Sequence, residues 1–185
     1  MLTLQHSPQS GKILPMGRGW LVTADTHWPR HGRDLPAWLL NAAAQADAIL
    51  HAGDLTDPAL LAVLERHAPV WAVAGNGDPP GEPRLPKKRL LDLGGLRVGM
   101  AHGHIGRPSA TTPDRAAAAF AGEAIDLVVF GHSHQPLWAK RPDGLWLLNP
   151  GSPTERRRAP ACTAAWLRLV DGAPRVEWLG GQSAL

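Results

Sequence analysis

Short apolar runs alternate with helical segments along the first half of the chain, and most of these runs end in a polar tip next to glycine. The early runs are almost continuously apolar, which is typical of strands covered on both faces. Cap-then-proline pairs at Asp57-Pro58 and Thr112-Pro113 mark two helix starts. The pattern predicts helices at residues 35–46, 58–68 and 114–124. It predicts strands at residues 20–24, 48–52, 70–74, 97–101, 127–130, 145–148, 162–170 and 175–179.

This order of elements predicts an α/β fold with a parallel sheet at its core, because strands and helices alternate in the first half. The second half is rich in strands and turns, which indicates antiparallel additions or a second sheet. Residues 79–90 and 106–113 are rich in proline and charge and are predicted to be surface loops. Residues 1–19 show no helix or strand pattern, so we expect an N-terminal extension before a single domain at 20–185. A chain that starts at Met16 is expected to fold.

Composition narrows the class of protein. At 185 residues the chain fits one compact domain, and its 44% hydrophobic content is ordinary for a globular protein. The net charge of +3 is too small to indicate nucleic-acid binding, although it mildly favours anionic partners. The single cysteine, Cys162, excludes an intramolecular disulfide and a cysteine-rich zinc site. A single cysteine suits a reducing cytoplasm, where we expect the protein to lie. No apolar run is long enough to span a bilayer, so the chain is not expected to enter membranes.

Five polar clusters each follow a predicted strand. In an open α/β sheet the ligand site lies outside the carboxyl ends of the strands, so these clusters are expected to meet at one edge. Partners two apart point the same way in extended backbone, and glycines allow sharp turns. The clusters are Asp25-Thr26-His27, Gly53-Asp54, Gly75-Asn76-Gly77-Asp78, His102-Gly103-His104 and Gly131-His132-Ser133-His134.

Carboxylate, amide oxygen and imidazole groups, without a thiolate, suit divalent ions of hard or borderline character. Each cluster alone is a common turn or a pair of surface histidines. All five in this order, each at a predicted strand end, indicate a metal site.

These motifs resemble the calcineurin-like metallophosphoesterase superfamily, and within it the small single-domain bacterial and archaeal phosphodiesterases (the YfcE type). The resemblance runs from about Trp20 to Val170 and includes the turn Asn149-Pro150-Gly151-Ser152. It implies a four-layer α/β/β/α sandwich of two mixed sheets with a two-metal site at one edge. The implied ligands are Asp25, His27 and His134 for one ion, Asn76, His102 and His132 for the other, and Asp54 as the bridge.

The resemblance implies a hydrolase that cuts a small phosphodiester, for example one derived from a nucleotide. In such a site a water between two ions loses a proton near neutral pH and attacks phosphorus in line. Mn²⁺ is the expected ion, with Fe²⁺, Co²⁺, Ni²⁺ and Zn²⁺ as alternatives. Asp54 and Asn76 would act in catalysis as ligands beside the phosphate.

Two positions depart from the family pattern. The family often has glycine after Asp-x-His, where this chain has Trp28, and the second departure concerns the proton donor. Larger relatives have histidine after the motif asparagine, where it can protonate the leaving group, and small ones often have cysteine. Here the position is Gly77, which has no side chain. His104 is therefore the candidate for orienting phosphate or supplying the proton, and the alternative is a supporting or merely exposed histidine.

Three other functions stay open at this point. A non-catalytic scaffold of the same fold is disfavoured because all seven ligand positions carry competent residues. A nuclease would need a long basic groove or an added domain. A phosphomonoesterase is distinguished only weakly from a phosphodiesterase by sequence.

Overall fold

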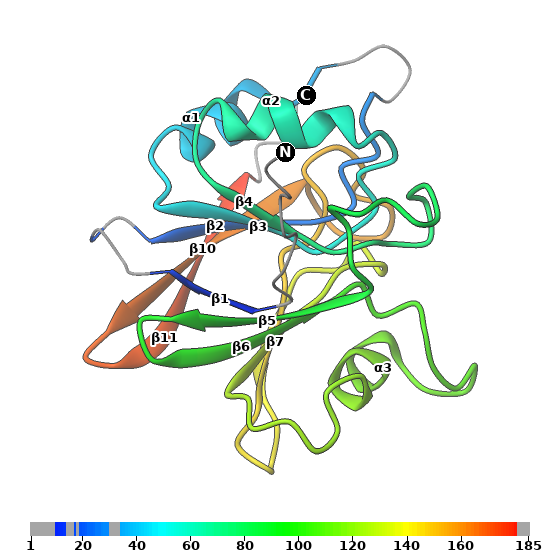
Figure 1. Cartoon of the computed structure of the whole chain (residues 1–185), viewed down its shortest axis with the longest axis vertical. Coiled ribbons are helices and arrows are strands. Elements are labelled where there is room, and N and C mark those ends of the chain that lie inside the picture. Colours follow the sequence, from blue (N-terminus) through cyan, green and yellow to red (C-terminus); the bar gives the residue numbers. More distant parts are fainter. Residues whose placement is uncertain (1–9, 14–16, 18, 30–33, 181–185) are drawn as a thin grey trace, which may run out of the picture.

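The computed structural model describes residues 10–13, 17, 19–29 and 34–180. Within them, two mixed β-sheets pack face to face and helices lie on their outer sides (Figure 1). The predicted four-layer α/β/β/α sandwich is confirmed. Among the described residues, no helix has the length and apolar character needed to cross a membrane.

The five-stranded sheet has the order β11-β10-β2-β3-β4. Its parallel part consists of β2 (Trp20–Thr23), β3 (Ala48–His51) and β4 (Val70–Ala72), and its antiparallel part of β10 (Thr163–Val170) and β11 (Ala173–Gly180). Helices α1 (Ala37–Ala43) and α2 (Ala59–Glu65) pack on its outer face through leucines and alanines. Both β2 and β3 are fully buried, as expected for strands covered on both sides.

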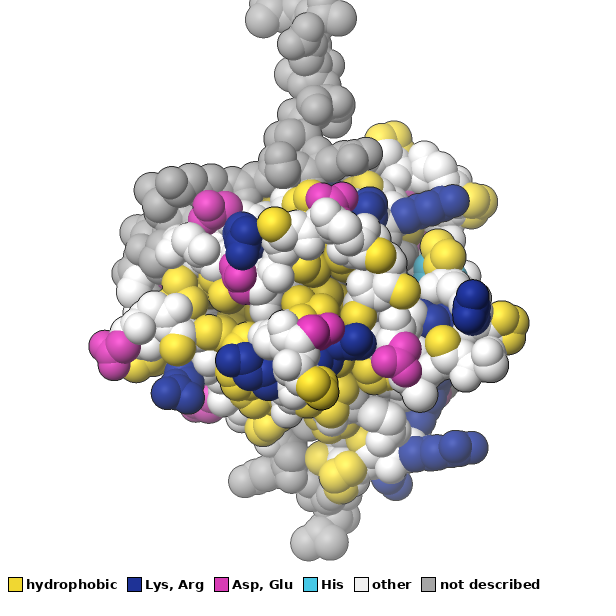
Figure 2. All heavy atoms as spheres, turned by 90° about the horizontal axis from the view of Figure 1, so that it is seen from below, with side chains coloured by type: hydrophobic (Ala, Val, Ile, Leu, Met, Phe, Trp, Pro, Cys, Tyr) yellow, Lys and Arg dark blue, Asp and Glu magenta, His cyan; other side chains and the backbone are white. Residues whose placement is uncertain are grey.

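The six-stranded sheet has the order β1-β5-β6-β7-β9-β8. Its strands are β1 (Ser10–Ile13), β5 (Lys88–Leu93), β6 (Leu96–Ala101), β7 (Leu127–Val129), β8 (Leu137–Lys140) and β9 (Trp146–Asn149). Helix α3 (Thr112–Ala118) packs on its outer face around Phe120 and Phe130. Figure 2, which views the molecule from this side, shows hydrophobic side chains across the middle of the face with charged ones both among and around them.

The inner faces of the two sheets form the largest core. Trp20, Val22 and Leu50 from one sheet meet Val98, Met100 and other apolar side chains of the second sheet, all fully buried. This core fixes the two sheets against each other. The loops at their carboxyl ends are therefore carried on rigid supports.

All eight predicted strands are confirmed, with small shifts at their ends, and three others were missed. Strand β1 lies within the expected extension and pairs in parallel with β5, so the expectation of no strand before Trp20 is wrong. Most other residues of that segment lie outside the described residues, and the domain boundary at residue 20 stays a prediction. The expected loop at 79–90 ends early because β5 begins at Lys88.

All three helices are shorter than predicted. The last expected turn of α1 is closed by tighter bonds, from the Gln45 N–H to the Ala42 carbonyl and from Ala46 to Ala43. Helix α3 begins at Thr112, two residues before its predicted start, and its cap is Thr111 rather than Thr112. The Thr111 hydroxyl accepts the Asp114 N–H at 3.3 Å.

Candidate functional site

The loops that follow β2 and β3, and the turns that follow β6 and β7, meet at one edge of the sandwich. The Asp25 N–H donates to the Gly53 carbonyl at 2.9 Å, and the Gly131 N–H donates to the His102 carbonyl at 3.1 Å. The N–H of His132 donates to the Asp25 carboxylate at 2.9 Å. The two backbone bonds thus join neighbouring loops within each sheet, and the bond from His132 to the Asp25 carboxylate joins the two sheets where the predicted polar clusters lie.

Two buried carboxylates stand at the centre of this edge. Asp54 presents its Oδ1 to His102 Nε2 at 3.3 Å and its Oδ2 to His27 Nε2 at 3.7 Å. Asp25 Oδ1 lies 3.3 Å from His134 Nε2 and 3.8 Å from His102 Nε2. Ligand atoms of Asp25, His27 and His134 lie within 4.8 Å of one another, as do those of Asp25, Asp54 and His102.

The structure therefore brings together five of the seven predicted ligand residues. One predicted set, Asp25 with His27 and His134, is complete, and Asp54 reaches towards histidines on both sides as a bridging residue would.

The remaining site residues lie next to these groups. The His132 ring centroid is 5.2 Å from that of His102, and the His104 ring is 5.3 Å from His102 and 6.2 Å from His132. Asn76 is exposed on the loop after β4, beside Gly77, whose N–H donates to Asp54 Oδ1 at 2.7 Å. His132 and Asn76 thus border the cluster on the His102 and Asp54 side.

The backbone of the site differs from the expectation. Asp25, His27 and Asp54 have positive φ angles of 53°, 43° and 57°, and His132 and His134 have 69° and 58°. The sequence suggested that the motif partners point the same way in extended backbone. In the structure they converge through left-handed backbone instead. Such backbone is costly outside glycine and gathers at functional sites.

His102 supplies a direct test of whether a cation fits here. Its Nδ1 lies 2.8 Å from the Ala52 carbonyl oxygen, so this nitrogen carries a proton and donates it. The other nitrogen, Nε2, is buried and has no hydrogen-bond partner among the described residues, yet it faces Asp54 and Asp25. A buried polar atom without a partner is costly, and a carbonyl-anchored imidazole facing carboxylates is how metal-binding histidines are held.

The His27 and His134 side of the site has the same character. His134 Nδ1 lies 2.6 Å from the Glu155 carbonyl oxygen and donates to it, leaving Nε2 without a proton in the neutral ring. That atom is 3.3 Å from His27 Nε2. Two imidazole nitrogens at this distance repel unless a proton or a cation lies with them, so the residues fit a bound metal ion.

Burial and charge set the protonation states before any ion binds. Burial lowers the pKa of His27, His104 and His132, which keeps these rings neutral near neutral pH. Burial alone would raise the pKa of Asp54, but His102 and the Gly77 N–H outweigh it and hold that pKa well below its usual range. Burial lowers the pKa of His102, and the two carboxylates outweigh this and raise it. The site is thus short of positive charge.

Sequence reasoning did not assign a role to Asp78, although it belongs to one of the polar clusters. Its carboxylate accepts the N–H groups of Asp54, Gly75 and Thr56 at 2.9, 2.7 and 2.8 Å. It fixes the loop after β3 against the loop after β4. The Gly-rich turn with an acidic residue was the signal that could have found it.

The turn Asn149-Pro150-Gly151-Ser152 follows β9, and the sequence alone does not predict what it contacts. Ser152 Oγ donates to the Asp25 carbonyl at 2.7 Å, and Thr154 Oγ1 donates to the Thr26 carbonyl at 2.8 Å. Asn149 donates to the Gly131 carbonyl at 2.8 Å. These bonds hold the left-handed backbone on both sides of the Asp25 cluster.

His51 is a second residue that the sequence analysis missed. It is fully buried at the end of β3, and the Gly53 N–H donates to its Nδ1 at 3.3 Å. Its Nε2 must then carry the proton and donate to Thr26 Oγ1 at 3.0 Å. A neutral His51 thereby joins the two loops that carry Asp25 and Asp54.

We expect acid to weaken the fold through His51. Burial lowers its pKa from 6.5 to about 4, so the unfolded chain takes up a proton first as the pH falls. This part of the stability is complete above about pH 6.5 and is lost towards pH 4, up to about 3 kcal/mol. Urea unfolding at pH 7 and pH 4.5 should give a smaller pH-dependent loss for His51→Gln, which keeps a donor to Thr26. Equal losses in both proteins would contradict the assignment.

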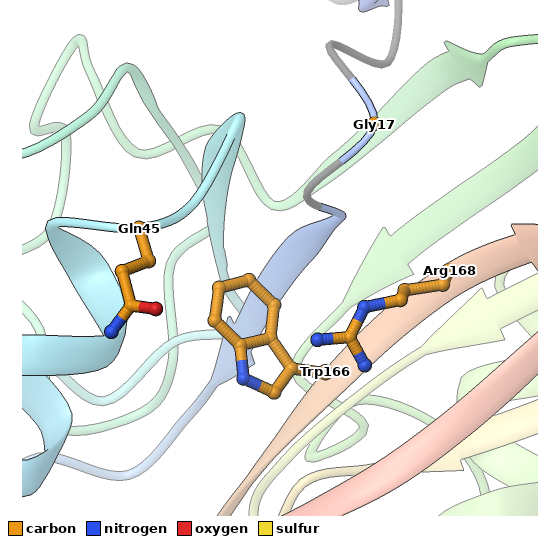
Figure 3. Close-up of a pocket in the computed structure, with 4 residues that line it drawn as sticks. All are labelled: Gly17, Gln45, Trp166 and Arg168. Carbon is orange, nitrogen blue, oxygen red and sulfur yellow. The ribbon is translucent and has the colours of Figure 1, made fainter.

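A cavity lies away from this polar cluster, at the other end of β2. It measures about 550 Å³ and is lined by Gly17, Gln45, Trp166 and Arg168, with the Arg168 guanidinium beside the indole ring (Figure 3). Trp166 pairs with Leu21, and Arg168 approaches Gly19, at the start of β2. Asp25 follows the other end of that strand, so this cavity is remote from the polar cluster.

Residues 20–172 match the family model of the calcineurin-like phosphoesterase superfamily domain. A probable metallophosphoesterase of Methanothermobacter thermautotrophicus is 39% identical over 136 residues, which cover 74% of this chain and 77% of that protein.

Solved structures agree on the fold. Wild-type Vps29 of Entamoeba histolytica, complexed with Zn²⁺, aligns with a TM-score of 0.67 and 22% identity over 88% of this chain and 99% of that one. A protein characterised as an archaeal phosphodiesterase aligns with a TM-score of 0.65 and 18% identity over 86% and 99%.

Proposed function

Because the chain belongs to the calcineurin-like phosphoesterase superfamily, we propose that it is a two-metal phosphodiesterase acting on a small phosphodiester. The single observation that carries this proposal is the buried Nε2 of His102, which faces two carboxylates and has no hydrogen-bond partner in the part of the chain that the structure describes. A bound divalent ion would supply the partner that this nitrogen lacks.

In this proposal one ion is held by Asp25, His27 and His134, and the other by Asn76, His102 and His132. Asp54 bridges them, and its two oxygens already face histidines of both sets. When bound, divalent ions supply Lewis acidity and a nucleophile at neutral pH. The oxygen and nitrogen donor set suits Mn²⁺ first, with Fe²⁺, Co²⁺, Ni²⁺ and Zn²⁺ as alternatives.

The chain's own residues have two tasks in the reaction. The loops after β2 and β3 hold Asp25 and Asp54 in fixed positions through Ser152, His51 and Asp78. Hydrolysis forms a bond from a water oxygen to phosphorus and breaks the bond to the leaving oxygen, which needs a proton. His104, next to His102, is the proposed residue for orienting the phosphate or supplying that proton.

Two further aspects belong to the same proposal. We propose a diester rather than a monoester as substrate. The structurally similar archaeal protein is described as a phosphodiesterase, and so are the small single-domain proteins that the motifs resemble. The free Cys162 suits a reducing compartment, so we place the protein in the cytoplasm.

The test is a screen of metals against substrates with chelator-treated protein. We expect Mn²⁺ to restore hydrolysis of bis-p-nitrophenyl phosphate more than that of p-nitrophenyl phosphate. Elemental analysis should approach two ions per chain. Two bound ions without hydrolysis of either ester would favour the scaffold, and a preference for the monoester would overturn the diesterase assignment.

A further inference from the structure

A second cavity, of about 290 Å³, opens directly beside the proposed metal site. His102 and His104 form one wall of it, so a molecule bound in this cavity would lie next to the reacting phosphate. The start of β5, the loop after β6 and helix α3 supply the remaining walls. The position of this cavity therefore suits the organic part of a substrate whose phosphate lies at the metal site.

Much of the wall is apolar. Ala101 and Ala118 line it, together with Ile105, which follows His104 directly. Ile105 is 55% exposed, although the large apolar side chains of this chain are mostly buried. An exposed isoleucine beside two small residues offers contact to an apolar or planar group and none to a strongly hydrated one.

Arg115 holds this wall in place and is not free to bind a ligand through most of its donors. Its guanidinium donates to the carbonyls of Gly103 and Ala110, both at 2.9 Å, and to Thr112 Oγ1 at 3.1 Å. These bonds fasten the loop that carries His104 and Ile105 to α3. The cavity is therefore formed before a ligand arrives, which lowers the entropic cost of binding.

The rim of the cavity carries two lysines in different situations. Lys88 donates to the Ala119 carbonyl at 3.3 Å and lies 3.6 Å from Glu123, so its charge is partly met. Lys87 is exposed and makes no hydrogen bond or ion pair within the described part of the chain. Lys88 pairs with Ala101 in the antiparallel ladder between β5 and β6. Lys87 and His102, the next residues outward in that register, therefore lie at the same end of the two strands.

We propose that this cavity binds the organic group of the diester and selects an apolar or aryl group that carries a second anionic substituent. The apolar wall at Ile105 would contact the ring, and Lys87 would meet the added negative charge. This inference rests on the proposed phosphodiesterase activity. It names a substrate class: diesters that carry a further carboxylate or phosphate a short distance from the reacting phosphorus.

Three diesters with the same p-nitrophenolate leaving group separate these contributions. Their second ester group is methyl, phenyl or 4-carboxyphenyl, so the bond that breaks is the same in each case. We expect kcat/KM to rise from methyl to phenyl to 4-carboxyphenyl in the Mn²⁺-loaded protein.

Two variants then assign the contacts. Because exposed ion pairs are worth little, Lys87→Glu should lower kcat/KM for the 4-carboxyphenyl ester only by roughly three- to tenfold more than it lowers kcat/KM for the methyl ester. The loss should shrink at high salt, and Lys87→Arg should restore the rate. Ile105→Ser should lower the rates for both aryl esters relative to the methyl ester. Lys140→Glu makes the same charge change on β8 and serves as the control.

The outcomes separate this inference from the function on which it rests. Hydrolysis of the methyl ester with equal kcat/KM for all three diesters would overturn the substrate class and leave the phosphodiesterase standing. Equal effects of Lys87→Glu and Lys140→Glu would overturn the role of Lys87. Hydrolysis of none of the three would overturn the proposed function itself.

Discussion

Asp54→Asn is expected to abolish the proposed shared metal site and to lower kcat/KM for bis-p-nitrophenyl phosphate by about 10³-fold or more. Asn has nearly the same shape but only one oxygen and no charge. It therefore cannot offer a carboxylate oxygen to both the ion on the His27 side and the ion on the His102 side. Loss of several kcal/mol of charge stabilisation in the transition state corresponds to a rate loss of this size. Ions per chain, measured after Mn²⁺ loading and gel filtration, should fall below two.

Asp171→Asn provides the matched control. Asp171 also has left-handed backbone, with φ of 51° against 57° for Asp54, and it lies exposed in the turn between β10 and β11. Asn tolerates this backbone region as well as Asp does, so both variants should fold. If Asp54→Asn kept two ions and the full rate, Asp54 would not be the bridge.

The parts of the fold that sequence could predict are those whose strands are buried on both faces. Strands β2 and β3 are continuous apolar runs with every side chain buried, and the pattern identifies both. Strand β5 begins with Lys88 and Arg89, whose charged ends reach Glu123 and the Trp71 ring beyond the sheet. Its polar half therefore resembled a loop. Strand β8 is an edge strand with no fully buried side chain. Its sequence therefore shows no clear alternation of apolar and polar residues.

The site was predictable to a similar extent. Parallel strands deliver their carboxyl ends to one edge, and this rule together with the family resemblance placed Asp25, Asp54 and His102 within contact of one another. Sequence could not predict the left-handed backbone of these loops, because non-glycine residues adopt it only where tertiary contacts enforce it. Ser152 and His51 supply such contacts from distant or buried positions.

The second large effect concerns the proton that the leaving group needs. Gly77 has no side chain, and His104 lines the cavity beside His102. We expect His104→Ala to slow diesters with alkoxide leaving groups by about 10²–10⁴-fold while sparing those with p-nitrophenolate, because only the poor leaving group requires a general acid. Rates for a series of leaving groups of rising pKa, measured where chemistry limits turnover, test this.

The same series separates His104 from an enzyme that has no acid at all. Without an acid, the wild-type log rate should fall steeply with leaving-group pKa, and His104→Ala should change both ends of the series alike. If His104 is the acid, Gly77→His in the His104→Ala background should partly rescue the poor leaving groups. The backbone of Gly77 is not left-handed, and a Cβ there would lie 3.3 Å from Asp54 Oδ1, so the side chain fits only tightly and rescue should be incomplete. A wild-type rate that is insensitive to leaving-group pKa, together with an unchanged rate in His104→Ala, would exclude both versions and require a different proton donor.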